Sequence, residues 1–293
     1  MLMPSYKTHS IHGELIYNAL LKYIEINRED FKSFCIGLDS LIMTDYNTFE
    51  YFHNHNVRDY YLELLRLIKE NKQLDNIELM AFLYGQLDHF VLDTVMHPLI
   101  YYMTENLTNE SILSPHALIE MGIDNYVMKK YDNNDLLYYH KLTIDNQETA
   151  VIIDELYKKF NILNAPLKYS LGIILTAYFD TFIRRDIGLF SSIVPKMINL
   201  GDVYYGDNID KVLPYLNLDK ALWYHPETGE EFNVSFDDLW EESLDLSREL
   251  MEDVNNYLYK DKEIKNSLIM DNISYDTGIA CEKGKTLKYV KKY

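Results

Sequence analysis

GQLDHFVLDTVMHPLIYY, residues Gly85–Tyr102, combines a helical pattern of apolar residues with three side chains that suit a metal ion. His89, Asp93 and His97 follow one another at intervals of four residues. On a helix each interval of four turns the side chain by only about 40°, so the three share one stripe. The residues between them are mostly apolar, and unpaired charge buried in such surroundings costs several kcal/mol per group. The stretch therefore predicts a buried helix that presents a row of metal ligands.

Three more residues describe the ends and the surroundings of this predicted helix. Asn76 is a typical N-cap residue, so the helix should begin just after it. Pro98 predicts a kink or an end directly after His97, because proline lacks an amide hydrogen and crowds the preceding turn. Gly85, one turn before His89 on the same stripe, would let a neighbouring helix or loop come close to the ligand row.

A second predicted helix adds two metal-type side chains. Ser114 before Pro115 marks its start, since serine caps helices and proline is tolerated in the first turn, and the pattern runs to about Tyr131. His116 and Glu120 are again four residues apart and share one face. The sequence thus offers five candidate ligands on two adjacent helices.

The spacing along the first helix indicates two ions. Eight residues at about 1.5 Å each separate the backbones of His89 and His97 by about 12 Å, too far for one ion at a Zn–N distance of about 2.0–2.1 Å. Asp93 lies midway, and a carboxylate can bridge two ions about 3.5–4 Å apart. His116 and Glu120 would complete the site of His97. A mixture of imidazoles and carboxylates suits Zn²⁺ better than Ca²⁺ or Mg²⁺.

The ion on His89 would need further ligands from elsewhere in the chain. The segment Gly37–His55, which we expect to be irregular, offers Asp39 and His53. His55 is an alternative to His53, two residues away. Nearer the start of the sequence, His9 has an alternative in His12.

The rest of the sequence predicts one all-α domain. Only 11 Gly and 7 Pro interrupt 293 residues, and apolar residues recur at helical spacing. Gly201–Ser235 is the best candidate for a loop, and we see no linker between domains. We expect a single domain over residues 1–293, with a metal-binding half at about 1–135 and a helical remainder at about 136–293. The other predicted helices are Ile11–Tyr23, one capped by Asn27, and Asn56–Ile68, Glu148–Asn161, Pro166–Arg185, Phe190–Leu200 and Phe236–Tyr259.

Composition limits the partners and the location. The net charge of −18 disfavours nucleic acid and anionic membrane surfaces, so we expect no nucleic-acid partner. The mean hydropathy is −0.24, and no stretch of about 18 apolar residues predicts a transmembrane segment. Two cysteines and no recognisable signal peptide predict a cytoplasmic protein with reduced thiols. Nothing in the sequence indicates an oligomeric state.

Several stretches together resemble the zinc-dependent phospholipase C family of Gram-positive bacteria. The stronger ones are MPSYKTHSIHGELIYNAL (Met3–Leu20), GLDS (Gly37–Ser40), GQLDHFVLDTVMHPLIYY (Gly85–Tyr102) and SPHALIEMGID (Ser114–Asp124). Weaker ones are WYHPETGEE (Trp223–Glu231) and NISYDTGIACEKGK (Asn272–Lys285). The resemblance implies the all-helical fold that this family shares with the S1/P1 nucleases.

The resemblance also implies a ligand assignment. One zinc ion would be held by Asp39, His53, His89 and Asp93, and a second by His97, His116 and Glu120. The interval from Asp39 to His53 resembles that of the family, which favours His53 over His55. His9 would hold a third ion with Asp93. Secreted members complete that third site with the free amino end of a processed N-terminal tryptophan, and this sequence has no tryptophan near its start.

Two functions fit these features. The first is a zinc-dependent hydrolase that cleaves a small phosphodiester or phospholipid-like substrate with metal-activated water, and Asp39 would orient or deprotonate that water. The second is a helical binding protein whose zinc is only structural. Structural zinc sites are closed, whereas catalytic ones keep an open position, so access to the site distinguishes the two. Tyr101 and Tyr102, next to the ligand row, would form an aromatic platform in the first case or part of the core in either.

Overall fold

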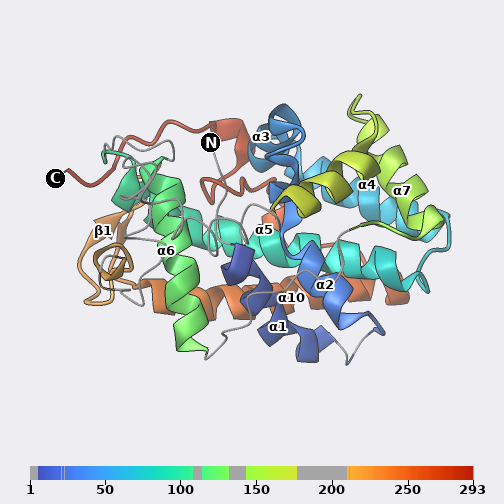
Figure 1. Cartoon of the computed structure of the whole chain (residues 1–293), viewed down its shortest axis with the longest axis horizontal. Helices are drawn as coiled ribbons and strands as arrows, with labels where there is room; N and C mark the ends of the chain where they lie inside the picture. The colour runs from blue at the N-terminus through green and yellow to red at the C-terminus, as the bar shows by residue number, and fades with distance from the viewer. Residues whose placement is uncertain are drawn as a thin grey trace, which may run out of the picture.

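The computed structural model describes residues 6–20, 22, 24–107, 114–131, 143–176, 210 and 212–292. Its longest helix, α5 (Ile77–Thr104), runs through the middle of the molecule, and α10 (Phe236–Lys260) lies alongside it (Figure 1). Almost every residue of α5 is buried, which explains why its sequence is apolar around most of its circumference. The predicted all-α architecture is confirmed.

Three helices cover α5 near the predicted ligand row. They are α1 (Tyr6–Leu20), α2 (Arg28–Phe34) and α6 (Pro115–Lys130). Both α1 and α2 pack on α5 and on each other, and α6 contacts α1 and α5 (Figure 1). The predicted caps are confirmed, because the side chains of Asn27, Asn76 and Ser114 each accept a backbone N–H of the first turn.

A second layer lies at the other end of α5. It contains α4 (Val57–Glu70), which packs against α7 (Gln147–Lys158) through buried aromatic rings such as Tyr60 and Tyr157, and the short α11 (Ser267–Met270) also contacts α4. Residues 165–176 are helical and confirm the start of the helix predicted at Pro166. The remainder of that prediction and the predicted helix Phe190–Leu200 lie outside the described residues.

The segment Gly37–His55 is not irregular, so this expectation is wrong. It forms the 3₁₀ helix η1 (Gly37–Leu41) and the α-helix α3 (Tyr46–Asn54), joined by a short turn. Asp45 caps α3 by accepting the backbone N–H of Thr48. One short polar cap thus suffices to start a helix of nine residues in a segment whose sequence shows no clear helical pattern.

Pro98 does not end α5, which continues to Thr104. Proline removes the hydrogen bond to the carbonyl group of Thr94, four residues earlier. That carbonyl group faces the C-terminal segment, because a Cβ atom at Gly278 would lie only 2.9 Å from the Thr94 oxygen. Burial of the following residues, such as Leu99 and Met103, keeps the helix in place beyond the proline.

The predicted loop Gly201–Ser235 contains regular structure in its described part. A turn of 3₁₀ helix, η4 (Leu213–Tyr215), precedes an antiparallel hairpin of β1 (Trp223–Tyr224) and β2 (Glu231–Phe232). The hairpin packs on α5, where Trp223 and Tyr102 are in ring contact, and Tyr102 is a half-buried side chain that packs against the core. Residues 201–209 and 211 of the prediction lie outside the described part.

After α11 the chain runs as an extended C-terminal segment that includes η5 (Cys281–Lys283). It returns to the ligand row, because the Tyr275 N–H donates to the carbonyl oxygen of His53 and the Lys291 N–H donates to that of Tyr102. This segment, residues 271–292, lies along α3, α5 and the hairpin (Figure 1). In the described residues, no helix has the length and apolarity needed to cross a membrane.

Gly85 allows α2 to lie directly on α5, as its position predicts. A Cβ atom at residue 85 would come within 2.6 Å of the Phe34 carbonyl carbon and 2.7 Å of the Phe34 Cβ. Real Cβ atoms do not approach other atoms so closely, and the Phe34 backbone cannot move without shifting α2.

We expect Gly85→Ala to destabilise the protein although alanine is the better helix former. The helix preference would add about 1 kcal/mol of stability, but the overlap with Phe34 should cost about 1–3 kcal/mol beyond that gain. The free energy of unfolding from urea denaturation measures the balance. A variant more stable than the parent would show that α2 is not held against Gly85.

Candidate metal centre

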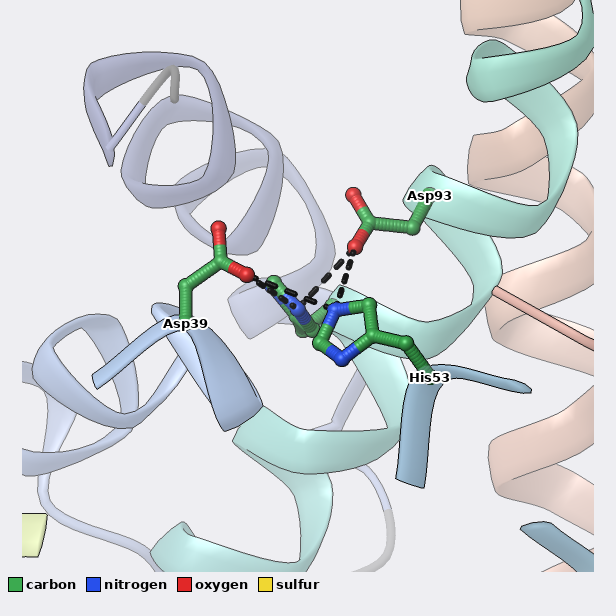
Figure 2. A group of neighbouring side chains, drawn as sticks. Asp39, His53 and Asp93 are labelled. Atoms are coloured by element: carbon green, nitrogen blue, oxygen red, sulfur yellow. Dashed lines mark ion pairs between the residues drawn. The ribbon is translucent and has the colours of Figure 1, made fainter. Parts of the chain in front are cut away.

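Four buried side chains gather on one side of α5. Asp39 comes from η1, His53 from α3, and His89 and Asp93 from α5, and one ligand atom of each lies within 4.8 Å of the others. Figure 2 shows the carboxylate groups of Asp39 and Asp93 both turned toward the ring of His53. Residues 54 positions apart in the sequence thus meet at one point, as the sequence and the resemblance led us to expect.

Gly37 brings η1 close enough to place Asp39 there. It has a φ of +58°, and a Cβ atom at this position would lie 2.1 Å from the ring of His89. Only glycine satisfies both conditions without a shift of the helix. The aspartate two residues later is therefore held against α5 by contact of the backbone with the His89 ring.

The donor set has the properties of an ion site. Within the described residues, His53 Nε2, His89 Nε2 and Asp93 Oδ2 are fully buried atoms without a hydrogen-bond partner. They nevertheless lie close together, with Asp93 Oδ2 at 3.0 Å from His89 Nε2 and 3.6 Å from His53 Nε2. Buried polar atoms rarely stay unpaired, and three that converge fit a cation held between them.

A second group lies further along α5. His97 Nε2 is 3.3 Å from Glu120 Oε1, and His116 Nε2 is 3.1 Å from the same oxygen. The three residues come from α5 and α6, which confirms that these helices are neighbours. Their ligand atoms again lie within 4.8 Å of one another, as zinc coordination requires.

Backbone carbonyl groups fix the orientation of one histidine in each group. His53 Nδ1 lies 2.9 Å from the carbonyl oxygen of Phe49, and His97 Nδ1 lies 3.0 Å from that of Tyr275. In its neutral form, a histidine that donates from Nδ1 to a carbonyl oxygen carries no proton on Nε2, which can then bind a metal. In both cases Nε2 is the atom that faces the group.

Asp93 lies between the two groups. One carboxylate oxygen, Oδ2, faces His53 and His89, whereas Oδ1 is 3.2 Å from His9 Nε2 and 4.0 Å from His97 Nε2. The two oxygens thus point to different histidines. This geometry matches the intermediate position that the four-residue spacing predicts for Asp93.

Neighbouring charges shift the pKa values of two histidines and one carboxyl group of the site. Burial opposes protonation of His53, but the adjacent Asp39 and Asp93 outweigh it and raise its pKa to about 10. Burial likewise opposes protonation of His97, and Asp93 and Glu120 raise its pKa to about 9. Burial would raise the pKa of Glu120, yet His116 and His97 lower it to about 2. The carboxylates therefore favour positive charge on His53 and His97, as they would favour a cation at the same place.

The two pairs of alternative histidines are separated by their surroundings. His55 is exposed, whereas His53 is buried in the first group, so the structure places His53 and not its rival at the cluster. His12 is buried away from the cluster and contacts Asp88 and Ser243. His9 is close to Asp93 and to His89 Nδ1, at 3.2 Å from each, but belongs to neither group of ligand atoms in the described residues.

Both groups open onto one cavity of about 350 Å³. Asp39 and His53 from the first group lie in its wall, together with all three residues of the second group. The other lining residues are Ile42, Tyr46, Phe49, Glu50, Tyr101, Glu105, Ser114, Ala117, Asp276, Lys285 and Leu287. A larger surface hollow around Asn76 and Glu78 lies away from the metal-type side chains.

The sequence alone did not single out Asp276 and Lys285. Asp276 is buried, and its Oδ2 accepts hydrogen bonds from Lys285 Nζ and Asn54 Nδ2, both at 2.8 Å. Burial would raise its pKa, but Lys285, His53 and His97 hold it well below the usual range. The stretch that contains both residues resembles the family weakly, and no spacing within it indicates a contact with α5.

Comparison with known proteins agrees with this geometry. No curated protein and no solved structure gives a significant match. A family model described as zinc dependent phospholipase C matches residues 8–179, more than half of the chain and all of the eight candidate ligands from His9 to Glu120. The chain therefore belongs to the zinc-dependent phospholipase C family.

Proposed function

We propose that the protein is a zinc-dependent hydrolase that cleaves phosphodiester bonds, in small molecules or in phospholipid-like substrates. Family membership and the buried metal-type cluster support a zinc-dependent hydrolase in general. One observation carries the more specific proposal: side chains of both groups line the same cavity. A structural zinc site would be closed by its ligands, whereas a catalytic site needs access for substrate.

The ligand assignment follows from the two groups. Asp39, His53, His89 and Asp93 would hold one zinc ion, and His97, His116 and Glu120 a second. Zinc bound there would supply Lewis-acid activation of water and of a phosphate oxygen. The three carboxylates contribute a charge of −3 against +4 from two ions, which leaves a small positive excess for an anionic phosphate. His9, beside Asp93 Oδ1, is the candidate for a third ion.

Asp39 is the best candidate for handling the proton of the attacking water. Its Oδ1 faces His53 at 3.4 Å and His89 at 3.7 Å, and Figure 2 shows the other carboxylate oxygen pointing away from the ring of His53. One oxygen can thus serve as a ligand while the other orients or deprotonates water in the cavity that Asp39 lines.

We also propose one domain for the whole chain and keep the cytoplasmic location as a prediction. The C-terminal segment contributes to the cavity, and α10 packs along α5, so residues beyond the matched region complete the site. The alternative, a binding protein with structural zinc, differs in a measurable way: it would bind zinc without any hydrolysis.

Metal content is the first test. We expect about two zinc ions per chain, since seven ligands exceed the needs of one tetrahedral ion with an open position. His53→Ala should lower the zinc content toward one, and the matched control His55→Ala should retain the parental value. Elemental analysis after gel filtration gives both numbers. Equal zinc in the two variants would remove His53 from the ligand set.

Zinc binding should depend on pH because His53 and His97 must lose protons. With pKa values of about 10 and about 9, both are protonated near neutral pH in the metal-free protein. In the protein without metal, the ion pairs of these protonated histidines contribute to the free energy of unfolding. This contribution is fully present below the ordinary histidine pKa of 6.5 and is lost as the pH rises through about 9 to 10. Zinc affinity should instead increase with pH over this range.

Calorimetry in buffers of different ionisation enthalpy measures the protons released on zinc binding. We expect release at pH 7 in the parent protein and less in His53→Ala, with His55→Ala as the control. Binding without proton release would show that these histidines are already neutral.

Chelation and Asp39→Asn together test catalysis. Chelation should lower the melting temperature and abolish hydrolysis of bis(p-nitrophenyl) phosphate, and added Zn²⁺ should restore both, because a ligand of the native state stabilises it. Asp39→Asn should lower kcat by roughly 100-fold or more while retaining most of the stability, and Asp59→Asn, an exposed site on α4, is the control.

Zinc-dependent stability without hydrolysis of any phosphodiester would favour the structural alternative. Unchanged turnover in Asp39→Asn would exclude its catalytic role.

A further inference from the structure

The cavity contains one basic side chain that the metal chemistry does not use. Among the described residues lining it, Lys285 is the only lysine or arginine. It comes from the C-terminal segment, beyond the region that matches the family model. In a site where an anionic substrate is expected, a lone ammonium group in the wall raises the question of what it binds.

Two neighbours hold Lys285 in a fixed position. Its Nζ lies 2.8 Å from Asp276 Oδ2 and 2.7 Å from the hydroxyl oxygen of Tyr101, and 4.2 Å from the centre of the Tyr101 ring. Asp276 is in turn 3.7 Å from His97 Nδ1, and the Tyr101 ring lies 4.5 Å from that of His116. The ammonium group is therefore positioned beside the His97, His116 and Glu120 group.

Hydrogen-bond counting leaves two donors for a ligand. An ammonium group has three N–H bonds, and the contacts with Asp276 and Tyr101 use two of them among the described residues. Tyr101 accepts from Lys285, so its own O–H hydrogen remains free to donate. Both residues line the cavity, and a phosphate group offers acceptor oxygens for both donors.

We propose that Lys285 and Tyr101 form a phosphate-binding donor pair, which contacts the phosphate oxygens of the substrate that the metal ions leave free. This inference rests on the proposed function and adds a substrate-recognition role for the C-terminal segment. Inorganic phosphate and the phosphodiester of a substrate share the chemistry that the pair recognises.

The simplest alternative is that Lys285 only neutralises the buried carboxylate of Asp276. The two explanations differ when both charges are removed together. Lys285→Met alone leaves Asp276 without its cation, whereas the double variant Lys285→Met/Asp276→Asn leaves no unpaired charge. If neutralisation is the whole role, the double variant should regain parental behaviour. If the pair binds phosphate, the double variant should stay weak.

The experiment measures binding of inorganic phosphate to the zinc-loaded protein by calorimetry, with zinc content and melting temperature recorded for each variant. We expect Lys285→Met and the double variant both to bind phosphate roughly 10- to 100-fold more weakly, as for loss of one charged hydrogen bond. Tyr101→Phe should weaken binding less, and Lys288→Met, an exposed lysine on the same segment, should bind like the parent. Lys285→Met and Tyr101→Phe should lose kcat/KM for bis(p-nitrophenyl) phosphate in parallel with their phosphate affinity, and Lys288→Met should keep the parental value.

Parental phosphate affinity in Lys285→Met with full zinc content would overturn the inference, and so would recovery in the double variant. Phosphate binding is read without turnover, so the result does not depend on whether the protein hydrolyses phosphodiesters. A parent protein that binds phosphate through Lys285 but cleaves no phosphodiester would contradict the proposed function and retain the donor pair.

Discussion

The carboxylate of Asp93 is the interaction on which the rest of the site depends. It is buried at the middle of α5, and histidines from three directions approach its two oxygens: His9 from α1, His53 from α3, and His89 and His97 from its own helix. Burial alone would make this carboxylate neutral, but the surrounding histidines hold its pKa well below the usual range. A buried anion so surrounded requires cations, as protons on the histidines or as metal ions.

The elements around α5 hold the ligand residues of this helix in place. η1 reaches α5 through Gly37, α2 through Gly85, and α6 through the contact of Glu120 with His97. The carbonyl oxygen of Tyr275 in the C-terminal segment orients the His97 ring, and the Tyr275 N–H binds the backbone of the helix that carries His53. The C-terminal segment therefore contacts the site through its backbone as well as through the side chains of Asp276 and Lys285. Residues near position 280 thus line the cavity although the family match ends at residue 179.

The sequence could predict what depends on local periodicity. The row on α5, the caps at Asn76 and Ser114, and the pairing of His97 with His116 and Glu120 all follow from spacing and from the chemistry of single residues. Spacing could not decide between His53 and His55, because burial decides it and burial depends on tertiary packing. The short helix α3 was missed for a similar reason: nine residues carry too little periodicity to indicate a helix on their own. Asp276 lies 179 residues from His97, and no local pattern signals a contact over such a separation.

His12, the second histidine of α1, also contacts α5, but its role is structural. His12 Nδ1 lies 2.9 Å from Asp88 Oδ1, and His12 Nε2 lies 3.0 Å from Ser243 Oγ. These residue types and distances are those of a Ser-His-Asp catalytic triad. All three residues are fully buried, and the Ser243 hydroxyl donates to the carbonyl oxygen of Trp240 at 2.7 Å, so no substrate can reach a free nucleophile. The triad instead joins α1, α5 and α10. Because His9 lies one turn before His12 and Asp88 directly precedes His89, this buried tie sets the position of α1 from which His9 meets Asp93.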